Sequence, residues 1–504
     1  MPAACPGGTC PPSMSKILKP LLLFTFVTFV IWVAVLWHWE ATRRDMTVPD
    51  IVIYLGVLPL VVIGLLLALR WAWSAAAKST AAGTSASAAA AAGTSASSQE
   101  EQRRHSTVKV LSAHVHCPTG EAASEMLEAA QAGKPRPGLD EELRGDDGLP
   151  VMCARIAAID TAEVDTLLEP VLAAVRKRKD AWADARVPSH VLRALGAMRQ
   201  PLGQALADLE PWARRLGAPP QDAATGADAA GSAGPAAMVR AVVGWPADWS
   251  EFEQALALGW VRWLITEDGA TSIPASRFVF DAHACTGEEL WLKADQLLQV
   301  LARETREDVV LLAACHSSIG EEAVAALAQQ QRLFSAAQHP KGLMPGEAAA
   351  ALVLAPPQWP AAPDEAQPPV QLHRPAVQRR DKSIEAGGRV SPDCLRDTLV
   401  QALSAGRLDA AAVGALVCDA DQHTPRSTEL FGTTLELLPH LDPTEDMRLI
   451  GVGTGHTGVA SALLVVAAAA ERARAAGLPT VALTLGDAFM RLALLVRPHA
   501  ASPT

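Results

Sequence analysis

The longest apolar stretches of the 504-residue chain lie near its N-terminus. Leu21–Trp37 and Ile51–Leu69 carry no charged residue, and each is about long enough to cross the hydrocarbon core of a bilayer. Tryptophans, which favour the membrane–water interface, flank both runs: Trp37, Trp39, Trp71 and Trp73. The pattern predicts a tail over residues 1–16 and a hairpin of two transmembrane helices within 17–73, at about 20–39 and 51–72.

A cleavable signal peptide is the alternative interpretation of the first run. It fits poorly, because Trp37-His38-Trp39-Glu40 stands where small residues are needed and a second apolar run follows. Lysines and arginines outside the hairpin outnumber those in its connection, namely Lys16, Lys19, Arg70 and Lys78 against Arg43 and Arg44. This bias favours both ends in the cytoplasm. The chain could start at Met1 or at Met14.

Low-complexity segments divide the rest of the chain. Residues 74–106 are rich in Ala, Ser, Thr and Gly, with the sequence AAGTSAS repeated from Ala81 and Ala91, and predict a flexible linker. The Ala/Gly-rich stretch Gly217–Ala237 predicts a surface loop. A Pro-rich connection over 356–371 separates an N-terminal half, 107–355, from a C-terminal half, 372–498.

Within both halves, short apolar runs alternate with longer stretches of helical periodicity, which predicts an α/β fold with helices covering a sheet. The expected strands are Val108–Val115, Arg277–Phe280, Asp308–Ala314, Ala411–Cys418, Met447–Val452, Thr480–Thr484 and Arg491–Val496. The expected helices include Glu121–Ala132, a helix ending near Val300, Ser391–Ala405 and the Ala-rich Gly458–Ala476.

The net charge of the chain argues against nucleic acid as a partner. The formal net charge is −11 and only 19% of residues are charged, so no basic surface is available to release counterions from a nucleic-acid backbone. The eight cysteines show neither CxxC nor Cys/His zinc spacing. We therefore expect no nucleic acid, no metal and no cofactor.

Three short motifs carry candidate chemistry. Ala284-Cys285-Thr286-Gly287 stands between an expected strand and an expected helix. Met344-Pro345-Gly346-Glu347 feeds a small apolar strand about a hundred residues before the turn Gly455-His456-Thr457-Gly458. A cysteine at a helix N-terminus is a candidate nucleophile, and a histidine can act as its acid or base.

Together with the opening Val108–Ala158 and the strand Asp308–Ala314, these motifs resemble in order and spacing, over about 390 residues, a β-ketoacyl synthase, a member of the thiolase-like superfamily. The resemblance implies layered sheets and helices, with Cys285 as the acyl-accepting nucleophile and His456 as one of two catalytic histidines. Four positions depart from the family pattern. Ala420 falls where the other histidine belongs, with His423 about three residues out of register; Gly451 replaces a lysine; Leu485–Phe489 replaces a Gly-Phe-Gly-Gly loop; and Asp281–Ala284 carries one residue too many.

These departures favour a pseudoenzyme in which Cys285 and His456 are vestigial and no residue is catalytic.

Two other motifs are weaker indications of chemistry. Gly453–Gly458 matches G-x-G-x-x-G but lies near the C-terminus, away from the first βα unit where a dinucleotide fingerprint belongs. Cys315-His316 imitates a nucleophile box but lies only 31 residues before Gly346.

An anchor, an Ala-rich linker and an eroded ketosynthase-like body together resemble the type VI secretion lipase adapter family. That resemblance implies a non-catalytic adapter at the bacterial inner membrane, with its soluble domain in the cytoplasm. Its implied partners are a lipase effector and the secretion spike protein, and homodimerisation is expected by analogy with ketosynthases. Two alternatives stay open: a membrane-bound acyltransferase or β-ketoacyl-synthase-like enzyme using Cys285 and His456, and a structural component of a membrane complex.

Overall fold

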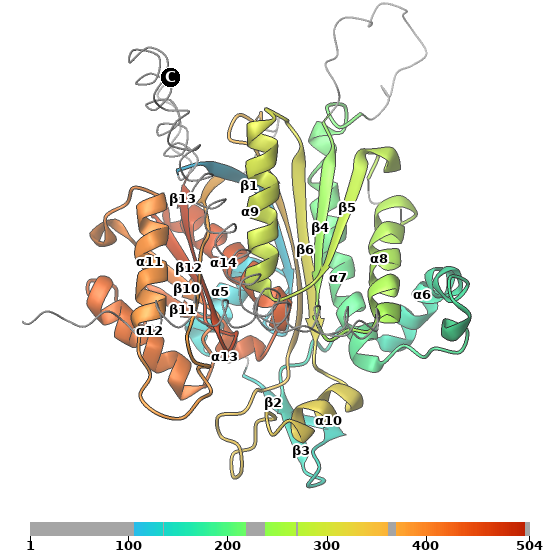
Figure 1. Ribbon diagram of the computed structural model, residues 1–504, viewed down its shortest axis with the longest axis horizontal. Helices are drawn as coiled ribbons and strands as arrows, with labels where there is room; N and C mark the ends of the chain where they lie inside the picture. The colour runs from blue at the N-terminus through green and yellow to red at the C-terminus, as the bar shows by residue number, and fades with distance from the viewer. Residues whose placement is uncertain (1–104, 135, 218–236, 269–270, 361–368, 499–504) are drawn as a thin grey trace, which may run out of the picture. The chain divides into compact units, whose positions relative to one another are not determined.

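The computed structural model describes residues 105–134, 136–217, 237–268, 271–360 and 369–498 (Figure 1). The expected tail, the transmembrane hairpin at 17–73 and nearly all of the linker lie outside these residues, as do most of Gly217–Ala237 and residues 361–368 of the Pro-rich connection. None of the helices in the described part of the chain is both long and apolar enough to cross a membrane.

The strands of the N-terminal half run in the order β5-β4-β6-β7-β1. Their bounds are β1 Thr107–His116, β4 Val239–Trp245, β5 Phe278–Ala284, β6 Val309–Ser317 and β7 Glu347–Ala355. β4 pairs in parallel with β5 and β6, whereas β7 is antiparallel to β6 and β1. A separate small hairpin is formed by β2 (Gly138–Arg144) and β3 (Pro150–Cys153).

The strands of the C-terminal half repeat this arrangement in the order β11-β10-β12-β13-β8. Their bounds are β8 Val370–His373, β10 Ala415–Cys418, β11 Met447–Leu449, β12 Thr480–Thr484 and β13 Met490–Pro498, with β9 (Ala376–Arg379) paired to β13. β10 is parallel to β11 and β12, and β13 is antiparallel to β12 and β8. The two edge strands β1 and β8 pair with each other, so the halves join.

Helices cover both faces of the strands in a layered arrangement (Figure 1). The outer layer of the N-terminal half contains α6 (Thr161–Arg176), α7 (Ser189–Ala207) and α8 (Glu251–Thr266). The middle layer contains α5 (Ala123–Ala132), α9 (Gly287–Arg303) and α14 (Ser461–Ala476). The outer layer of the C-terminal half contains α11 (Asp393–Ala405) and α12 (Thr424–Leu437). Shorter elements are α10 Glu321–Gln329, α13 Gly451–Thr454, and the 3-10 turns at Asp180–Trp182, Glu210–Trp212, Ala275–Arg277, Ala410–Ala412 and Gly458–Ala460.

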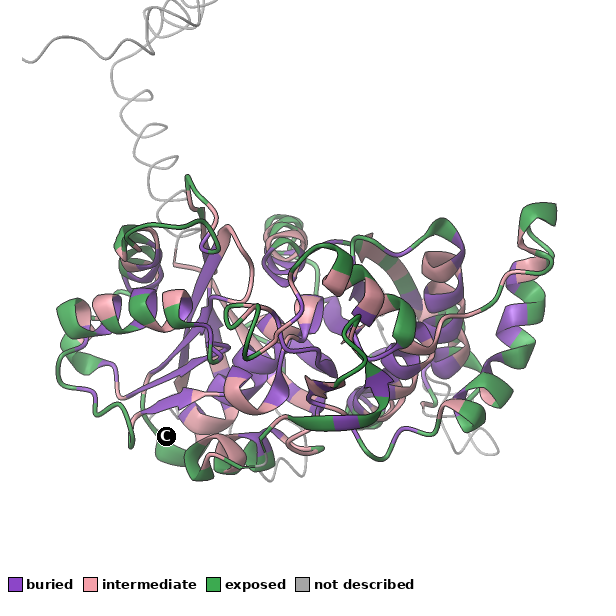
Figure 2. Ribbon diagram, turned by 90° about the horizontal axis from the view of Figure 1, so that it is seen from below, coloured by how far each residue is buried: buried purple, intermediate pink, exposed green. Residues whose placement is uncertain are grey.

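The alternation of side chains along the strands builds one core for each helical layer. On β6, Val309, Leu311 and Ala313 pack toward the outer helices, and Val310, Leu312 and Ala314 pack toward the middle layer. A third core lies beneath α11 and α12. Figure 2 shows these buried surfaces running through the interior, with exposed residues on the outer helices.

Most of the expected elements are confirmed, and three differ for local reasons. The strand expected at Ala411–Cys418 begins only at Ala415, because Ala410–Ala412 forms a 3-10 turn. The strand expected at Arg277–Phe280 continues to Ala284, because β5 pairs with β4 in unbroken register up to Trp245↔Ala284. The strand expected at Met447–Val452 ends at Leu449 and turns into α13. Gly451 packs so closely against the chain after β10 that a Cβ there would lie 2.1 Å from the Asp419 carbonyl oxygen. The close approach at this turn therefore requires glycine.

Candidate active site

A cavity of about 680 Å³ opens where the parallel strands of both halves end. Residues just beyond the carboxyl ends of β5, β10 and β12 line it, together with His316 from the last residues of β6 and the Gly455–Val459 turn that precedes α14. The carboxyl edge of parallel strands is the usual location of binding sites in α/β proteins. Cys285 and His456, which lie 171 positions apart in the sequence, both line this cavity.

Cys285 stands between β5 and α9, directly before Thr286, which caps the helix. The Thr286 hydroxyl accepts a hydrogen bond from the amide of Glu289, and the Glu289 carboxylate accepts one from the amide of Thr286, a capping box that fixes the start of α9. The amide of Cys285 donates to the Trp245 carbonyl at 3.1 Å. The sequence motif therefore places the thiol at a rigid strand-to-helix elbow.

The Cys285 thiol is uncharged at rest. Burial raises its pKa to about 12, and the carboxylates of Glu289 and Glu288 act in the same direction, with Lys293 opposing them. The partial positive charge of the α9 N-terminus favours a thiolate, but burial outweighs it here. Such a thiol can attack an acyl group only by losing its proton during the reaction.

His456 lies on a turn that the Gly-Glu motif holds in place. The His456 amide donates to the Met344 carbonyl at 2.8 Å, and a Cβ at Gly346 would lie 2.3 Å from the Thr454 carbonyl oxygen. The two motifs recognised in the sequence are thus in direct contact. Burial, with smaller contributions from His316, Arg426 and Arg332, holds the pKa of His456 well below its ordinary value. His456 is therefore a neutral imidazole.

A second imidazole reaches the cavity from β6 and was set aside in the sequence analysis. The His316 ring lies 5.4 Å from the His456 ring, centroid to centroid, in an edge-to-face arrangement at 84°. Burial lowers the pKa of His316 to about 4, with His190 adding to the effect and Asp248 opposing it. The spacing between His316 and Gly346 in the sequence gave no indication that His316 reaches this cavity. β6 and β7 are antiparallel neighbours, so the end of β6, with His316, lies beside the start of β7.

The C-terminal half places no histidine at the position where the family resemblance implied one. Ala420 is fully buried, and His423 caps α12 and borders a separate cavity with Lys341 and Gly342. The residues shortly after β10 that line the main cavity are Asp419 and Asp421. This half therefore presents a carboxylate where an imidazole was expected.

Asp419 binds the loop that follows β12. Its carboxylate accepts hydrogen bonds from the amides of Leu485 at 2.6 Å and Gly486 at 3.2 Å, and it also bonds to the Ser461 hydroxyl. Next to it, Arg426 is paired with Asp421 at 2.7 Å and donates to the Gly486 carbonyl at 2.8 Å. Burial raises the pKa of Asp419, and these hydrogen bonds and Arg426 oppose the rise. The amides of Leu485 and Gly486 are therefore occupied by protein.

Glu288 is a further buried acid in the cavity, three residues after Cys285. The Thr484 hydroxyl lies 2.6 Å from its carboxyl group, and only 5% of the residue is exposed. Burial raises its pKa to about 7, and the nearby carboxylates of Asp487 and Asp419 add to the effect. Its place in the first turn of α9 was the one sequence signal that it faces the same cavity as the thiol.

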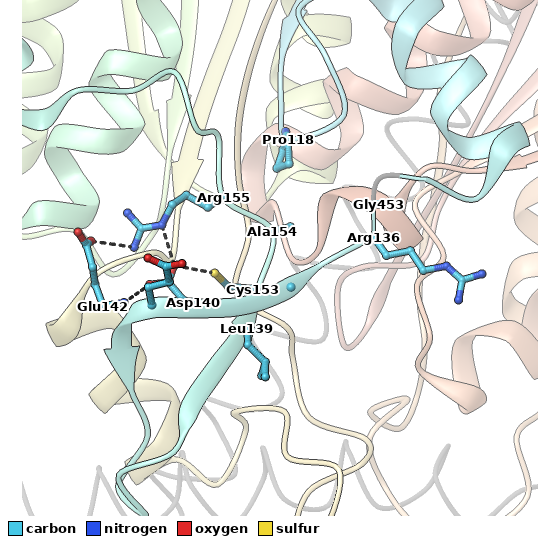
Figure 3. A pocket seen from close by; sticks show the side chains of 11 residues that line it. Pro118, Arg136, Leu139, Asp140, Glu142, Cys153, Ala154, Arg155 and Gly453 are labelled. Carbon is cyan, nitrogen blue, oxygen red and sulfur yellow. Dashed lines mark hydrogen bonds and ion pairs between the residues drawn. The ribbon is translucent and has the colours of Figure 1, made fainter.

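Another cavity, of about 400 Å³, is lined in part by Gly453 of α13 (Figure 3). It contains Cys153, whose thiol donates to Asp140 at 3.1 Å, and Arg155, which bonds to the same carboxylate at 2.7 Å. Burial raises the pKa of Cys153 to about 12. Because these groups satisfy one another, the arrangement is structural.

No group of three or more His, Cys, Asp or Glu side chains in the described residues is arranged to hold a metal ion. What the main cavity offers is a thiol at a helix N-terminus, two neutral imidazoles and a buried acid with a pKa near neutrality. This set suits acyl transfer, in which a thiol attacks a thioester while neighbouring groups move a proton and stabilise an oxyanion.

No family model and no curated protein matches the chain. Among solved structures, the ketosynthase from module 6 of the bacillaene synthase from Bacillus subtilis 168 is similar, with a TM-score of 0.50, 11% identity and coverage of 78% of this chain and 72% of that one. The ishigamide ketosynthase/chain length factor (TM-score 0.42, 13% identity, 78% and 99% covered) and the cerulenin-bound OleA of Xanthomonas campestris (0.42, 13%, 78% and 98%) also match.

The likeness to the Bacillus ketosynthase shows a thiolase-like, ketosynthase-like α/β fold and confirms that part of the sequence prediction. Nothing in the comparisons supports membership of the type VI lipase adapter family or an adapter function.

The prediction of a non-catalytic protein is contradicted. The cysteine and histidine that the prediction treated as vestigial line one cavity with a second imidazole, in a fold similar to that of the Bacillus ketosynthase. The prediction failed because it looked for both histidines in the C-terminal half and counted one as lost.

Proposed function

We propose that the protein is an acyl-transfer enzyme that takes an acyl group onto Cys285 by thioester exchange and uses His456 in the proton transfer. The observation that carries the proposal is that Cys285, at the N-terminal end of α9, shares a cavity with the neutral imidazole of His456. The wider match to ketosynthase structures supports the same class of chemistry.

The first step follows from the uncharged resting state. As the Cys285 sulfur bonds to the acyl carbon, its proton passes to a neutral imidazole, and the carbon–sulfur bond of the donor breaks. The imidazolium then returns the proton to the departing thiolate, so the products are acyl-Cys285 and the free donor thiol. Attack on the acyl-enzyme by an acceptor regenerates the Cys285 thiol.

The charge of the cavity favours acyl transfer over condensation with an anionic extender unit. Six carboxylic side chains line it, Asp248, Glu288, Glu385, Asp419, Asp421 and Asp487, against two arginines, Arg332 and Arg426. Arg426 is paired with Asp421, and Arg332 lies 3.5 Å from Glu385. A malonyl carboxylate would therefore enter an already negative site, which costs free energy at low dielectric.

We also propose that residues 17–73 hold this enzyme at the bacterial inner membrane with the described body in the cytoplasm. The apolar runs, the flanking tryptophans and the positive charges support that proposal.

Intact-mass spectrometry of the full chain tests the proposed activity. After incubation with octanoyl-CoA or an octanoyl carrier-protein thioester, we expect a gain of one acyl group that Cys285→Ala abolishes. Cys153→Ala is the matched control, because it removes another buried thiol with a pKa of about 12 and should keep the adduct. A folded wild type that gains no acyl group from either donor, or an adduct that persists in Cys285→Ala, would contradict the proposal.

A further inference from the structure

The hydrogen-bond donors that a ketosynthase-like site would offer a substrate carbonyl are already in use. The Cys285 amide donates to the Trp245 carbonyl, and the amides of Leu485 and Gly486 donate to Asp419. An oxyanion that forms on acyl attack needs other donors, because an unstabilised oxyanion in a water-poor cavity raises the barrier.

His316 has donor and acceptor capacity to spare. Neither of its ring nitrogens has a hydrogen-bond partner among the described residues, although both atoms are buried. A neutral imidazole carries one N–H donor and one acceptor, and leaving such atoms buried and unpaired costs free energy. The side chain lines the cavity that contains Cys285 and His456, so a bound carbonyl could satisfy it.

The backbone of His316 is held rigidly from both sides. The neighbouring Ser317 hydroxyl donates to Glu347 at 2.9 Å, and Glu347 is bound by two nitrogens of Arg193 at 2.6 and 2.8 Å, all within the buried interior. His316 itself pairs with Ala348 across β6 and β7. Fixed positioning of this kind is what a donor aimed at a reacting oxygen requires.

The turn opposite His316 is shaped to admit its ring. Gly458 has φ +47°, and a Cβ at that position would lie 2.3 Å from Nδ1 of His316. Glycine at this position is thus explained by the imidazole as well as by the backbone conformation.

We propose that His316 is the second imidazole of this site and donates a hydrogen bond to the carbonyl oxygen of the reacting acyl group beside His456. The proposal rests on the proposed acyl-transfer function and deepens it. It assigns to β6 of the N-terminal half a role that the sequence resemblance sought after β10 in the C-terminal half.

The first test measures the rate of Cys285 acylation by octanoyl-CoA in the full chain. His316→Ala should slow acylation by about 10²-fold, the usual effect of removing one oxyanion donor. His316→Gln, which keeps an N–H donor, should recover part of the rate. His373→Ala is the matched control, because His373 is also buried, has a pKa lowered to about 4 and has no hydrogen-bond partner for either ring nitrogen within the described part of the chain, but lies on β8 away from this cavity.

If His316→Ala acylates at the wild-type rate, or if His373→Ala is slowed equally, the proposal is overturned. A second measurement separates it from the proposed activity. Calorimetric binding of octanoyl-CoA to Cys285→Ala should weaken about threefold to tenfold when His316→Ala is added, as expected for one lost hydrogen bond.

If the wild type forms no adduct, the acyl-transfer function fails, and the binding result alone decides the role of His316. Weaker binding in the double variant would still assign carbonyl recognition to His316. Equal binding, or none in Cys285→Ala, would overturn that role too.

Discussion

The two halves of the molecule share one strand order, but different kinds of side chain stand at the carboxyl ends of their strands. In the N-terminal half, β5 and β6 end in uncharged groups, the Cys285 thiol and the His316 imidazole. In the C-terminal half, the chain after β10 contributes Asp419 and Asp421, which tie down the loop after β12 directly or through Arg426. In a repeated framework, one half can therefore carry the reactive groups while the other half holds a loop beside the site in place.

Each half also has its own buried ion pair, and breaking these pairs should have the largest effect. Glu429 lies between Arg491 and Arg380, and Glu347 binds Arg193. Glu429→Ala and Glu347→Ala should each lower the free energy of unfolding by about 3–5 kcal/mol in urea titrations, because a buried guanidinium loses its partner. Only Glu347→Ala should also slow acylation, since Glu347 fixes the residue next to His316.

The control for this pair is Glu163→Ala, which breaks an exposed ion pair with Arg199 and should change stability by less than about 1 kcal/mol. Equal destabilisation by all three variants, or an unchanged acylation rate in folded Glu347→Ala, would remove the contrast between the halves.

Glu288 should give the next largest effect, and it depends on pH. Its pKa rises from 4.5 to about 7 on folding, so the folded state binds its proton more tightly. The stability that this proton contributes is fully present below pH 4.5 and is lost as pH rises toward 7, a change of about 3 kcal/mol. Glu288→Gln should flatten the stability profile across that window and raise stability at neutral pH.

Unfolding titrations of wild type and Glu288→Gln at several pH values measure this difference. Glu128→Gln, a change of an exposed acid on α5, should leave the wild-type slope intact. Parallel profiles for wild type and Glu288→Gln would show that the buried acid does not titrate in this range.

Gly458→Ala should separate backbone strain from displacement of the His316 ring. The left-handed backbone at Gly458 should cost an alanine about 1–2 kcal/mol of stability. Gly477→Ala should cost a similar amount, because Gly477 has φ +66° but open space where its Cβ would lie. Only Gly458→Ala should also slow acylation, by about 10-fold to 10²-fold, because it pushes an imidazole out of position. Similar acylation rates in the two variants would mean that the contact with His316 is unimportant.

The smallest expected effect concerns the reactivity of Cys285 itself. With a pKa of about 12, its alkylation by iodoacetamide should be slow at neutral pH and rise about tenfold per pH unit up to about pH 11. Glu289→Gln should speed alkylation by a few fold, because it removes the negative charge that contributes most to raising the pKa of Cys285. Glu253→Gln, in the corresponding capping box of α8, should not. A plateau near pH 8 would show an activated thiol and reverse this description of the site.

The architecture could be predicted well from the sequence, because helices and strands are marked by the local periodicity of apolar residues. Strands such as β12, Thr480–Thr484, are fully buried and contain an apolar run at Val481–Leu483, and helices such as α11 have a clear amphipathic pattern. The Cys285 elbow and the Gly455–Gly458 turn were also recognisable, because glycines and a capping threonine mark them locally.

The electrostatic and long-range parts of the site could not be predicted. His316 joins His456 through strand order, Asp419 meets the amide of Leu485 66 positions away, and the pKa of Glu288 depends on burial. None of these relations leaves a pattern in the neighbouring residues. The absence of a histidine at Ala420 was therefore predicted correctly, but the conclusion that the protein is non-catalytic was wrong.

The helices of the middle layer also determine the distance between Cys285 and His456. A Cβ on Gly287 would lie 2.8 Å from the Cβ of Ala462, so the first turns of α9 and α14 touch. One helix follows Cys285 and the other follows His456, and the fully buried alanines of α14, such as Ala467–Ala470, set how near the surrounding strands can approach. The gap between nucleophile and imidazole is thus determined by methyl groups that never meet a substrate. Replacing one of these alanines with a larger residue would therefore change the reactivity of Cys285 without altering any residue of the cavity.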